Sequence, residues 1–157
     1  MGQKISKIVR ELLRDGDPPE IRTVTALTPA GPSLKGLKIL VVDDQLAGEI
    51  EEWLKPYEAK VTATSSAAEG YEAYQQARGA YDVVLLDLSM PVEGGRTLHE
   101  RLKNLAEQLG VLLTVIFITA HAEQFPEVSA FNHGAVDYIV KPFDGEQLAQ
   151  RIQEAVA

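Results

Sequence analysis

The chain has 157 residues, of which 45% are apolar and 24% are charged. This length and composition suit one soluble globular domain with a short extension. The absence of cysteine excludes disulfides and cysteine-ligated metal sites, and it is compatible with the reducing cytoplasm, where we expect the protein to act. The net charge of -8 disfavours nucleic-acid binding, since an acidic surface repels phosphate backbones. No apolar run approaches the length of a membrane-spanning helix, so we expect no membrane insertion.

Residues 1–35 are predicted to form a short amphipathic helix followed by a linker. Apolar side chains within residues 3–14 recur at the helical period, and the Lys and Arg side chains lie off this stripe. Residues 15–36 contain four prolines and three glycines, which is typical of a linker. We place the domain boundary near Gly36. Because so short a helix is unstable alone, we expect it to dock on the main domain, mediate self-association or contact a partner.

The main domain, residues 36–157, alternates short apolar runs with helical patterns. Continuous apolar runs indicate strands that are covered on both faces. Five strands alternating with five helices predict a doubly wound, parallel α/β sheet with helices on both faces. Strands are expected at residues 39–42, 60–63, 81–86, 112–118 and 136–140. Helices are expected at residues 46–55, 66–78, 96–109 and 144–156, and a further one is expected to end near His133.

Polar residues follow four of the five predicted strands. Asp43 and Asp44 follow the first strand, Asp87 the third, Thr119 the fourth and Lys141 the fifth. In an open parallel sheet, ligands bind outside the carboxyl ends of the strands. These five side chains, far apart in the sequence, are therefore expected to meet at one edge of the sheet.

The chemistry of this set favours phosphoryl transfer. Three clustered carboxylates repel one another and need a proton or a metal to neutralise them. Oxygen ligands without His or Cys suit a hard cation such as Mg²⁺. Lys141 adds a positive charge, and the Thr119 hydroxyl can donate a hydrogen bond. Such a site neutralises a transferring phosphoryl group, and one carboxylate can itself be the nucleophile and become an acyl phosphate.

Four sequence segments together resemble the receiver domain of two-component response regulators, of the single-domain, CheY-like kind. They are Val41-Val42-Asp43-Asp44, then Leu86-Asp87-Leu88-Ser89-Met90-Pro91 with Gly94-Gly95, then Thr119-Ala120, and finally residues 134–143, Gly-Ala-Val-Asp-Tyr-Ile-Val-Lys-Pro-Phe. The resemblance covers residues 36–157 and implies the flavodoxin-like receiver fold.

The resemblance also implies a role for each acidic residue. Asp87 would be the phosphoacceptor. Asp44 and Asp87 would ligate Mg²⁺ directly, together with the backbone carbonyl of Ser89. Asp43 would act through a metal-bound water. The protein would catalyse only its own phosphorylation and dephosphorylation and would not be an enzyme in the wider sense.

The remaining implied roles concern the switch and the partners. Thr119 and Lys141 would contact the phosphoryl oxygens, the Lys141-Pro142 peptide bond would be cis, and Tyr138 would be the aromatic that turns inward on activation. The phosphodonor in this family is a phosphohistidine on a sensor histidine kinase or a histidine phosphotransfer protein. Homodimerisation could use the N-terminal helix or the face formed by the fourth helix, fifth strand and fifth helix.

Two alternatives to an active switch remain. One is a receiver-like scaffold that is never phosphorylated. The other is a Mg²⁺-dependent aspartyl phosphohydrolase, but that class needs a second Asp two residues after the first, where this chain has Ser89. The 35 leading residues are too few for a DNA-binding output domain, so we expect an unidentified downstream protein partner or a phosphorelay. His99 is expected at the surface of its helix.

Overall fold

The computed structural model describes residues 32–121 and 137–157. The predicted N-terminal helix, most of the linker and the helix expected to end near His133 lie outside the described residues. The main compact unit comprises Ser33–Ala157.

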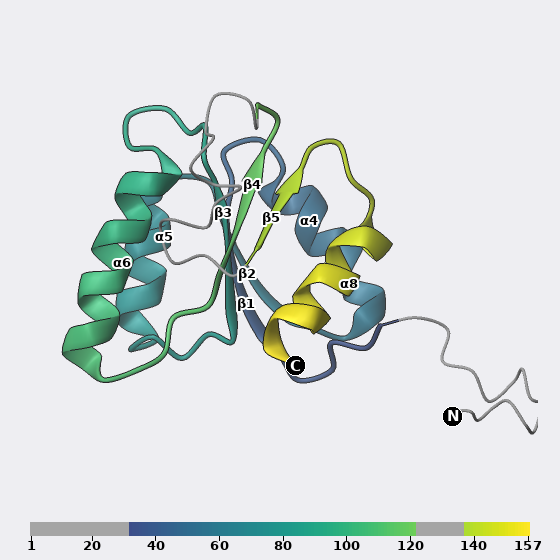
Figure 1. Cartoon of the computed structure of the whole chain (residues 1–157), viewed down its shortest axis with the longest axis horizontal. Coiled ribbons are helices and arrows are strands. Elements are labelled where there is room, and N and C mark those ends of the chain that lie inside the picture. Colours follow the sequence, from purple (N-terminus) through teal and green to yellow (C-terminus); the bar gives the residue numbers. More distant parts are fainter. Residues whose placement is uncertain (1–31, 122–136) are drawn as a thin grey trace, which may run out of the picture. The chain divides into compact units, whose positions relative to one another are not determined.

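The sheet of this unit has five parallel strands in the order β2-β1-β3-β4-β5. The reversal of strand order beside β1 is the mark of a doubly wound sheet, so the predicted fold class is confirmed. Figure 1 shows that the strands share one direction, with their carboxyl ends at the top of the view. The strands are β1 (Lys38–Val42), β2 (Lys60–Thr64), β3 (Val83–Asp87), β4 (Val115–Thr119) and β5 (Asp137–Val140).

Helices cover both faces of the sheet. Helices α5 and α6 pack on one face, and α4 and α8 pack on the other (Figure 1). In the described part of the chain, no helix has both the length and the apolar character needed to cross a membrane. The helices are α4 (Ala47–Leu54), which continues into the 3₁₀ helix η2 (Lys55–Tyr57), then α5 (Ala67–Gln76), α6 (Gly95–Leu109) and α8 (Gly145–Val156).

Local signals set the helix ends. The Ser66 side chain begins α5 by accepting the backbone N–H of Glu69 at 3.1 Å. Asp144 and Gln147 form a reciprocal capping box at the start of α8. Gly110 ends α6 in the left-handed conformation, where glycine carries no steric penalty. Each boundary lies within two residues of its predicted position.

Side chains of the central strands divide between two cores. Along β1, Leu40 and Val42 face α5 and α6, whereas Ile39 and Val41 face α4 and α8. All four side chains are fully buried, as expected for a strand covered on both faces. The edge strand β2 is more exposed. The double-sided core holds the strand ends, and therefore the site, in fixed relative positions.

His99 is buried, so the expectation that it lies at the surface is wrong. Only 2% of its surface is exposed, and its ring meets Phe117 edge-on with centroids 5.2 Å apart. His99 falls within the apolar stripe of α6 between Leu98 and Leu102, since residues at i, i+3 and i+4 share a helix face.

Trp53, on α4, contacts the segment that joins β5 to α8. Its ring is half-buried and packs edge-on against Phe143, with centroids 5.9 Å apart. A β-carbon at Gly145 would lie only 3.1 Å from that of Trp53, so α4 and the start of α8 are in close contact. Phe143 lies two residues after Lys141, and this contact therefore fixes the segment that carries the lysine.

Leu34 belongs to the core of the main unit. Its side chain is fully buried among the residues between the sheet and helices α4 and α8. Its backbone N–H donates to the carbonyl of Tyr57 at 3.0 Å. The compact unit thus begins a few residues before Gly36, where the linker composition placed the boundary.

Replacing Leu34 with Ala should lower the free energy of unfolding by about 2–5 kcal/mol, the usual cost of a cavity in a packed core. Urea unfolding measures this change. Leu112, which is 84% exposed, is the matched control, and Leu112→Ala should stay within about 0.5 kcal/mol of the wild type. Equal, small effects at both positions would show that residue 34 is not part of the folded unit.

Candidate functional site

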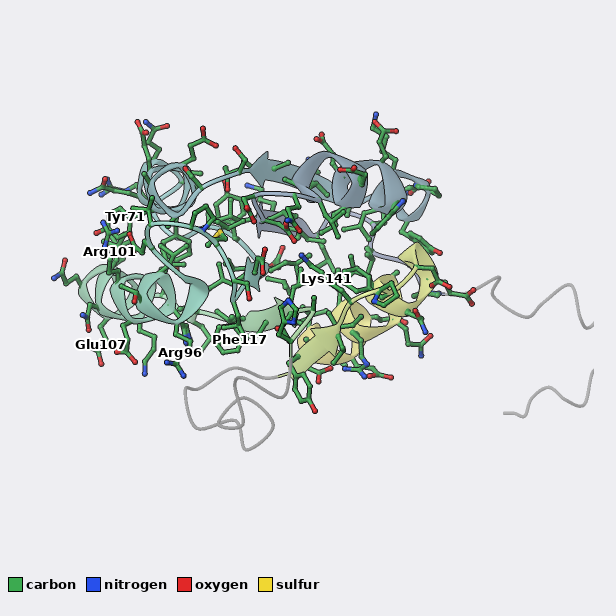
Figure 2. The ribbon with its side chains drawn as sticks, turned by 90° about the horizontal axis from the view of Figure 1, so that it is seen from above. Tyr71, Arg96, Arg101, Glu107, Phe117 and Lys141 are labelled. Carbon is green, nitrogen blue, oxygen red and sulfur yellow. The ribbon has the colours of Figure 1, made fainter. Side chains whose placement is uncertain are left out.

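The carboxyl ends of four strands bring the predicted site residues to one edge of the sheet. Asp43 and Asp44 follow β1, Asp87 ends β3, Thr119 ends β4 and Lys141 follows β5. The strands that carry these residues are hydrogen-bonded neighbours. Figure 2 looks down on this edge, with Lys141 between the two helical layers.

Three carboxylates form the centre of this site. Asp43, Asp44 and Asp87 each have a carboxylate oxygen within 4.8 Å of the others. Asp43 is fully buried and Asp87 is 2% exposed. One oxygen of Asp43 accepts the backbone N–H groups of Gln45 and Leu46, at 2.8 and 2.9 Å, which orients this carboxylate at the start of α4.

Lys141 supplies a positive charge to this cluster. Its Nζ lies 3.2 Å from Asp43 Oδ2 and 3.5 Å from Asp87 Oδ2. Its backbone N–H donates to the Thr119 carbonyl at 2.7 Å. The Lys141-Pro142 peptide bond is cis, as the resemblance implies.

The donor set fits a divalent cation. Three carboxylates and one ammonium group leave a formal charge of about -2 in a buried space, which one Mg²⁺ would neutralise. Asp43 Oδ2 and Asp44 Oδ1 are buried and have no hydrogen bond of good geometry from the described residues, although Asp43 Oδ2 forms the ion pair with Lys141. Buried polar atoms are normally satisfied, so these two oxygens are suited to ligate a metal or its bound water.

The environment of Asp87 disfavours its charged form. Burial is the main cause that raises the pKa of the Asp87 carboxyl, and the carboxylates of Asp43 and Asp44 add to it. The hydrogen bond from the Ser89 N–H and the positive charge of Lys141 oppose this rise. A cation at the site would reverse the balance by stabilising the carboxylate.

The hydroxyl of Thr119 is fully buried beside the cluster. It accepts the backbone N–H of His121 at 2.9 Å, and a hydroxyl that accepts one hydrogen bond can still donate its own proton. Tyr138 is half-buried on β5, opposite Phe117 of β4, and packs against the core between the sheet and α6. Thr119 thus lies on β4, the strand next to β3, and Tyr138 lies on β5, the strand next to β4.

The segment after β3 folds back closely over Asp87. The Ser89 N–H donates to Asp87 Oδ1 at 3.0 Å, and the side chains of Leu88 and Met90 are buried on either side of Ser89. Gly95, at the start of α6, touches the backbone of Asp87 so closely that a β-carbon there would collide with the Asp87 carbonyl oxygen. The position of Asp87 is therefore fixed by its neighbours in the chain.

A cluster of Glu93, Arg101 and Tyr71 beside this segment was not predicted from the sequence. Arg101 Nη1 lies 2.7 Å from Glu93 Oε1, and its guanidinium carbon lies 4.1 Å from the ring centroid of Tyr71. Figure 2 shows Arg101 and Tyr71 close together between α6 and α5. An ion pair eight residues apart has no periodic signal, since helical neighbours are three or four apart.

Comparisons with known proteins agree with this geometry. The sequence matches the family described as the response regulator receiver domain over residues 39–153. It is 35% identical over 119 residues to the transcriptional regulatory protein CiaR of Streptococcus pneumoniae, covering 74% of this chain and 50% of that protein. The chain spans about half the length of this and the other first curated relatives.

Two solved structures show the same fold. A response regulator receiver domain protein from Clostridium thermocellum has 28% identity and a TM-score of 0.67, covering 76% of this chain and 94% of that one. The receiver domain of a sensor histidine kinase from Pseudomonas aeruginosa has 25% identity and a TM-score of 0.64, covering 77% and 98%. That structure has a magnesium ion coordinated in its active-site cleft.

The fold and the acidic site define a receiver domain. The chain belongs to the response regulator receiver domain family of two-component systems.

Replacing Gly95 with Ala should lower the free energy of unfolding by about 1–3 kcal/mol, since the added methyl overpacks the contact with Asp87. Thermal or urea unfolding measures the change. Gly48 in α4 is the matched control, because its β-carbon would enter open space. Gly48→Ala should stabilise the protein by up to about 1 kcal/mol through helix propensity. Equal effects of the two substitutions would contradict the close contact at Gly95.

Asp87→Asn should stabilise the metal-free protein at neutral pH. A raised carboxyl pKa means that the folded state binds the proton more tightly than the unfolded state does. The contribution of Asp87 to the unfolding free energy of the wild type therefore falls as pH rises from below the ordinary Asp pKa, about 3.9, to above the raised value. Asn has no carboxyl to titrate, so the variant does not lose this stability. The difference in unfolding free energy between Asp87→Asn and the wild type should therefore grow between the ordinary and the raised pKa and stay constant at higher pH.

Urea unfolding in EDTA at several pH values measures this difference. Mg²⁺ at about 100 times its Kd should restore about 2.7 kcal/mol to the wild type and less to Asp87→Asn, which lacks one of the three carboxylates that could hold the cation. A stability gap that is independent of pH would show that Asp87 has an unperturbed carboxyl.

Proposed function

We propose that the chain accepts a phosphoryl group on Asp87 and that this modification controls its binding to another protein or passes the group along a phosphorelay. The observation that supports this most directly is the convergence of three carboxylates and Lys141 at the carboxyl ends of the strands. The phosphodonor is a phosphohistidine on a sensor histidine kinase or a phosphotransfer protein. The cysteine-free sequence is compatible with the cytoplasm, where we place this exchange.

Asp87 is the nucleophile of the proposed reaction. One carboxylate oxygen forms a bond to phosphorus as the bond from phosphorus to the histidine nitrogen breaks, and the imidazole leaves with that electron pair. Dephosphorylation is a separate step: a water oxygen forms a bond to phosphorus, the bond from phosphorus to the Asp87 oxygen breaks, and the carboxylate leaves with that electron pair. The protons of the water stay with the inorganic phosphate that is released. The protein thus catalyses only changes to its own Asp87.

Three other groups stabilise the charge that develops. Mg²⁺, held by Asp44, Asp87 and the Ser89 carbonyl, with Asp43 acting through a bound water, would neutralise charge on the phosphoryl oxygens. Lys141, now paired with Asp43 and Asp87, would turn to a phosphoryl oxygen. Thr119 would donate its hydroxyl proton to another. These roles are positioning and charge neutralisation, which supply most of the catalysis of phosphoryl transfer.

The signal is read on the surface formed by β5 and α8. Movement of Thr119 toward the phosphoryl group opens space for Tyr138, which lies on the neighbouring strand. A hollow of about 460 Å³ adjoins this residue and is lined by Val140, Phe143, Gln147 and Arg151, among others. We propose that the downstream protein binds here. Homodimerisation through the N-terminal helix, or through the face formed by the predicted fourth helix, the fifth strand and the fifth helix, stays a prediction.

Incubation with acetyl phosphate and Mg²⁺ should add one base-labile phosphoryl group per chain, measured by intact-protein mass spectrometry. Asp87→Asn should lose the modification, as should the wild type in EDTA, because one removes the nucleophile and the other the cation. Lys141→Ala should still be phosphorylated but should bind its downstream partner more weakly on activation. A normal partner response in Lys141→Ala would contradict the role of the lysine.

The same assay separates the two alternative functions. A receiver-like scaffold would incorporate no phosphate despite ample donor and Mg²⁺. An aspartyl phosphohydrolase would release phosphate continuously from many phosphate esters. Its proton donor would have to stand at Ser89, whose hydroxyl is a poor acid at neutral pH.

A further inference from the structure

The segment between Asp87 and α6 contains a strained turn. The Glu93 N–H donates to the Pro91 carbonyl at 2.7 Å, which closes a three-residue turn around Val92. Val92 has a φ of 68°, and a turn with positive φ at its centre is the rare, strained form. Val92 is β-branched and fully exposed, so its own side chain contributes no buried contact to hold this conformation.

The cluster of Glu93, Arg101 and Tyr71 holds this turn from outside. Arg101 extends from α6, pairs with Glu93 at 2.7 Å and lies over the ring of Tyr71 on α5. The Arg101 and Glu93 side chains are 44% and 21% exposed, so solvent screens the pair and its direct contribution to folding is small. Its effect is geometric, since it joins the turn to two helices.

This turn also restrains the backbone that carries Ser89. Glu93 directly precedes Gly94, where a β-carbon would lie 3.2 Å from the Leu88 carbonyl. The Gly95 N–H also points to that carbonyl, at 3.4 Å. The end of the segment thus packs on the Leu88 carbonyl, directly before Ser89, whose own carbonyl is a proposed Mg²⁺ ligand.

We propose that Arg101 is a positioning residue for the metal site: by holding Glu93, it keeps the strained turn closed and the Ser89 carbonyl aimed at the cation. This inference rests on the proposed function, because it assumes that Mg²⁺ binds at the three carboxylates. Arg101 acts through Glu93 and touches no ligand itself. Its loss weakens Mg²⁺ binding but leaves the three carboxylates and Lys141 in place.

Arg101→Met is the test variant, since it keeps an apolar side chain on Tyr71 but cannot pair with Glu93. Mg²⁺ binding to the unphosphorylated protein is measured by isothermal titration calorimetry. The Kd should rise roughly tenfold, at the lower end of the range for residues that orient metal ligands. At saturating Mg²⁺, phosphorylation by acetyl phosphate should reach the wild-type extent.

Lys103→Met is the matched control. Lys103 also lies on α6, and its Nζ is 3.8 Å from the carboxylate of the exposed Glu100, a longer ion pair than that of Arg101. Both substitutions remove one positive charge, which by itself would tighten cation binding. If Mg²⁺ affinity falls in Arg101→Met but not in Lys103→Met, the cause is therefore a change in the geometry of the site and not the loss of a positive charge. Arg101→Lys, which keeps the charge and can still reach Glu93, should recover most of the affinity. Urea unfolding in EDTA confirms that each variant is folded at the temperature of the titration.

The outcomes separate this inference from the proposed function. Wild-type Mg²⁺ affinity in Arg101→Met, with or without a change in stability, would overturn the positioning role and leave the proposed function standing. A wild-type protein that bound no Mg²⁺ would overturn both.

Discussion

Repulsion among three carboxylates is the constraint on which the rest of the structure depends. Asp43, Asp44 and Asp87 are brought within reach of one another, and two of them are almost completely buried. A charged cluster of this kind is unfavourable unless it is compensated. Lys141 compensates only in part. The core on both faces of the sheet supplies the stability that holds these groups together, and the remaining charge is available to bind a cation.

Parallel topology converts distant sequence positions into one site. The carboxyl ends of parallel strands lie at the same edge of the sheet. Residues at these ends therefore meet in one site even when they are far apart in the sequence. Asp87 is additionally fixed by Gly95, which allows α6 to begin directly against its backbone. Lys141 is fixed by the contact between Phe143 and Trp53. The site therefore draws its geometry from the strands, from the start of α6 and from the packing of α4 on the segment after β5.

The sequence was sufficient to predict the sheet, the helices on its two faces and the residues at the strand ends. Continuous apolar runs such as residues 39–42, each followed by polar residues, predicted the strands of the sheet. The same criterion misjudged Leu112, which is apolar but 84% exposed and precedes β4. Composition alone cannot tell an exposed apolar loop residue from a strand residue.

The contacts that particular side chains make between secondary-structure elements could not be predicted from the sequence. The apolar stripe of α6 includes His99, because burial follows position on the helix and not residue type. The pair of Glu93 and Arg101 depends on how a turn meets a helix, and no spacing rule covers this. Leu34 appeared to belong to the linker because prolines and glycines surround it, although its side chain is part of the core. In each case tertiary packing overrode a local pattern.

The contact of Trp53 with Phe143 also has an optical consequence. Trp53 is the sole tryptophan of the chain, and its indole lies against the segment that carries Lys141. Indole emission depends on the polarity and the quenching groups around the ring. The chain therefore contains an intrinsic fluorophore beside the lysine-bearing segment, and rearrangement of that segment changes the light it emits without any attached dye.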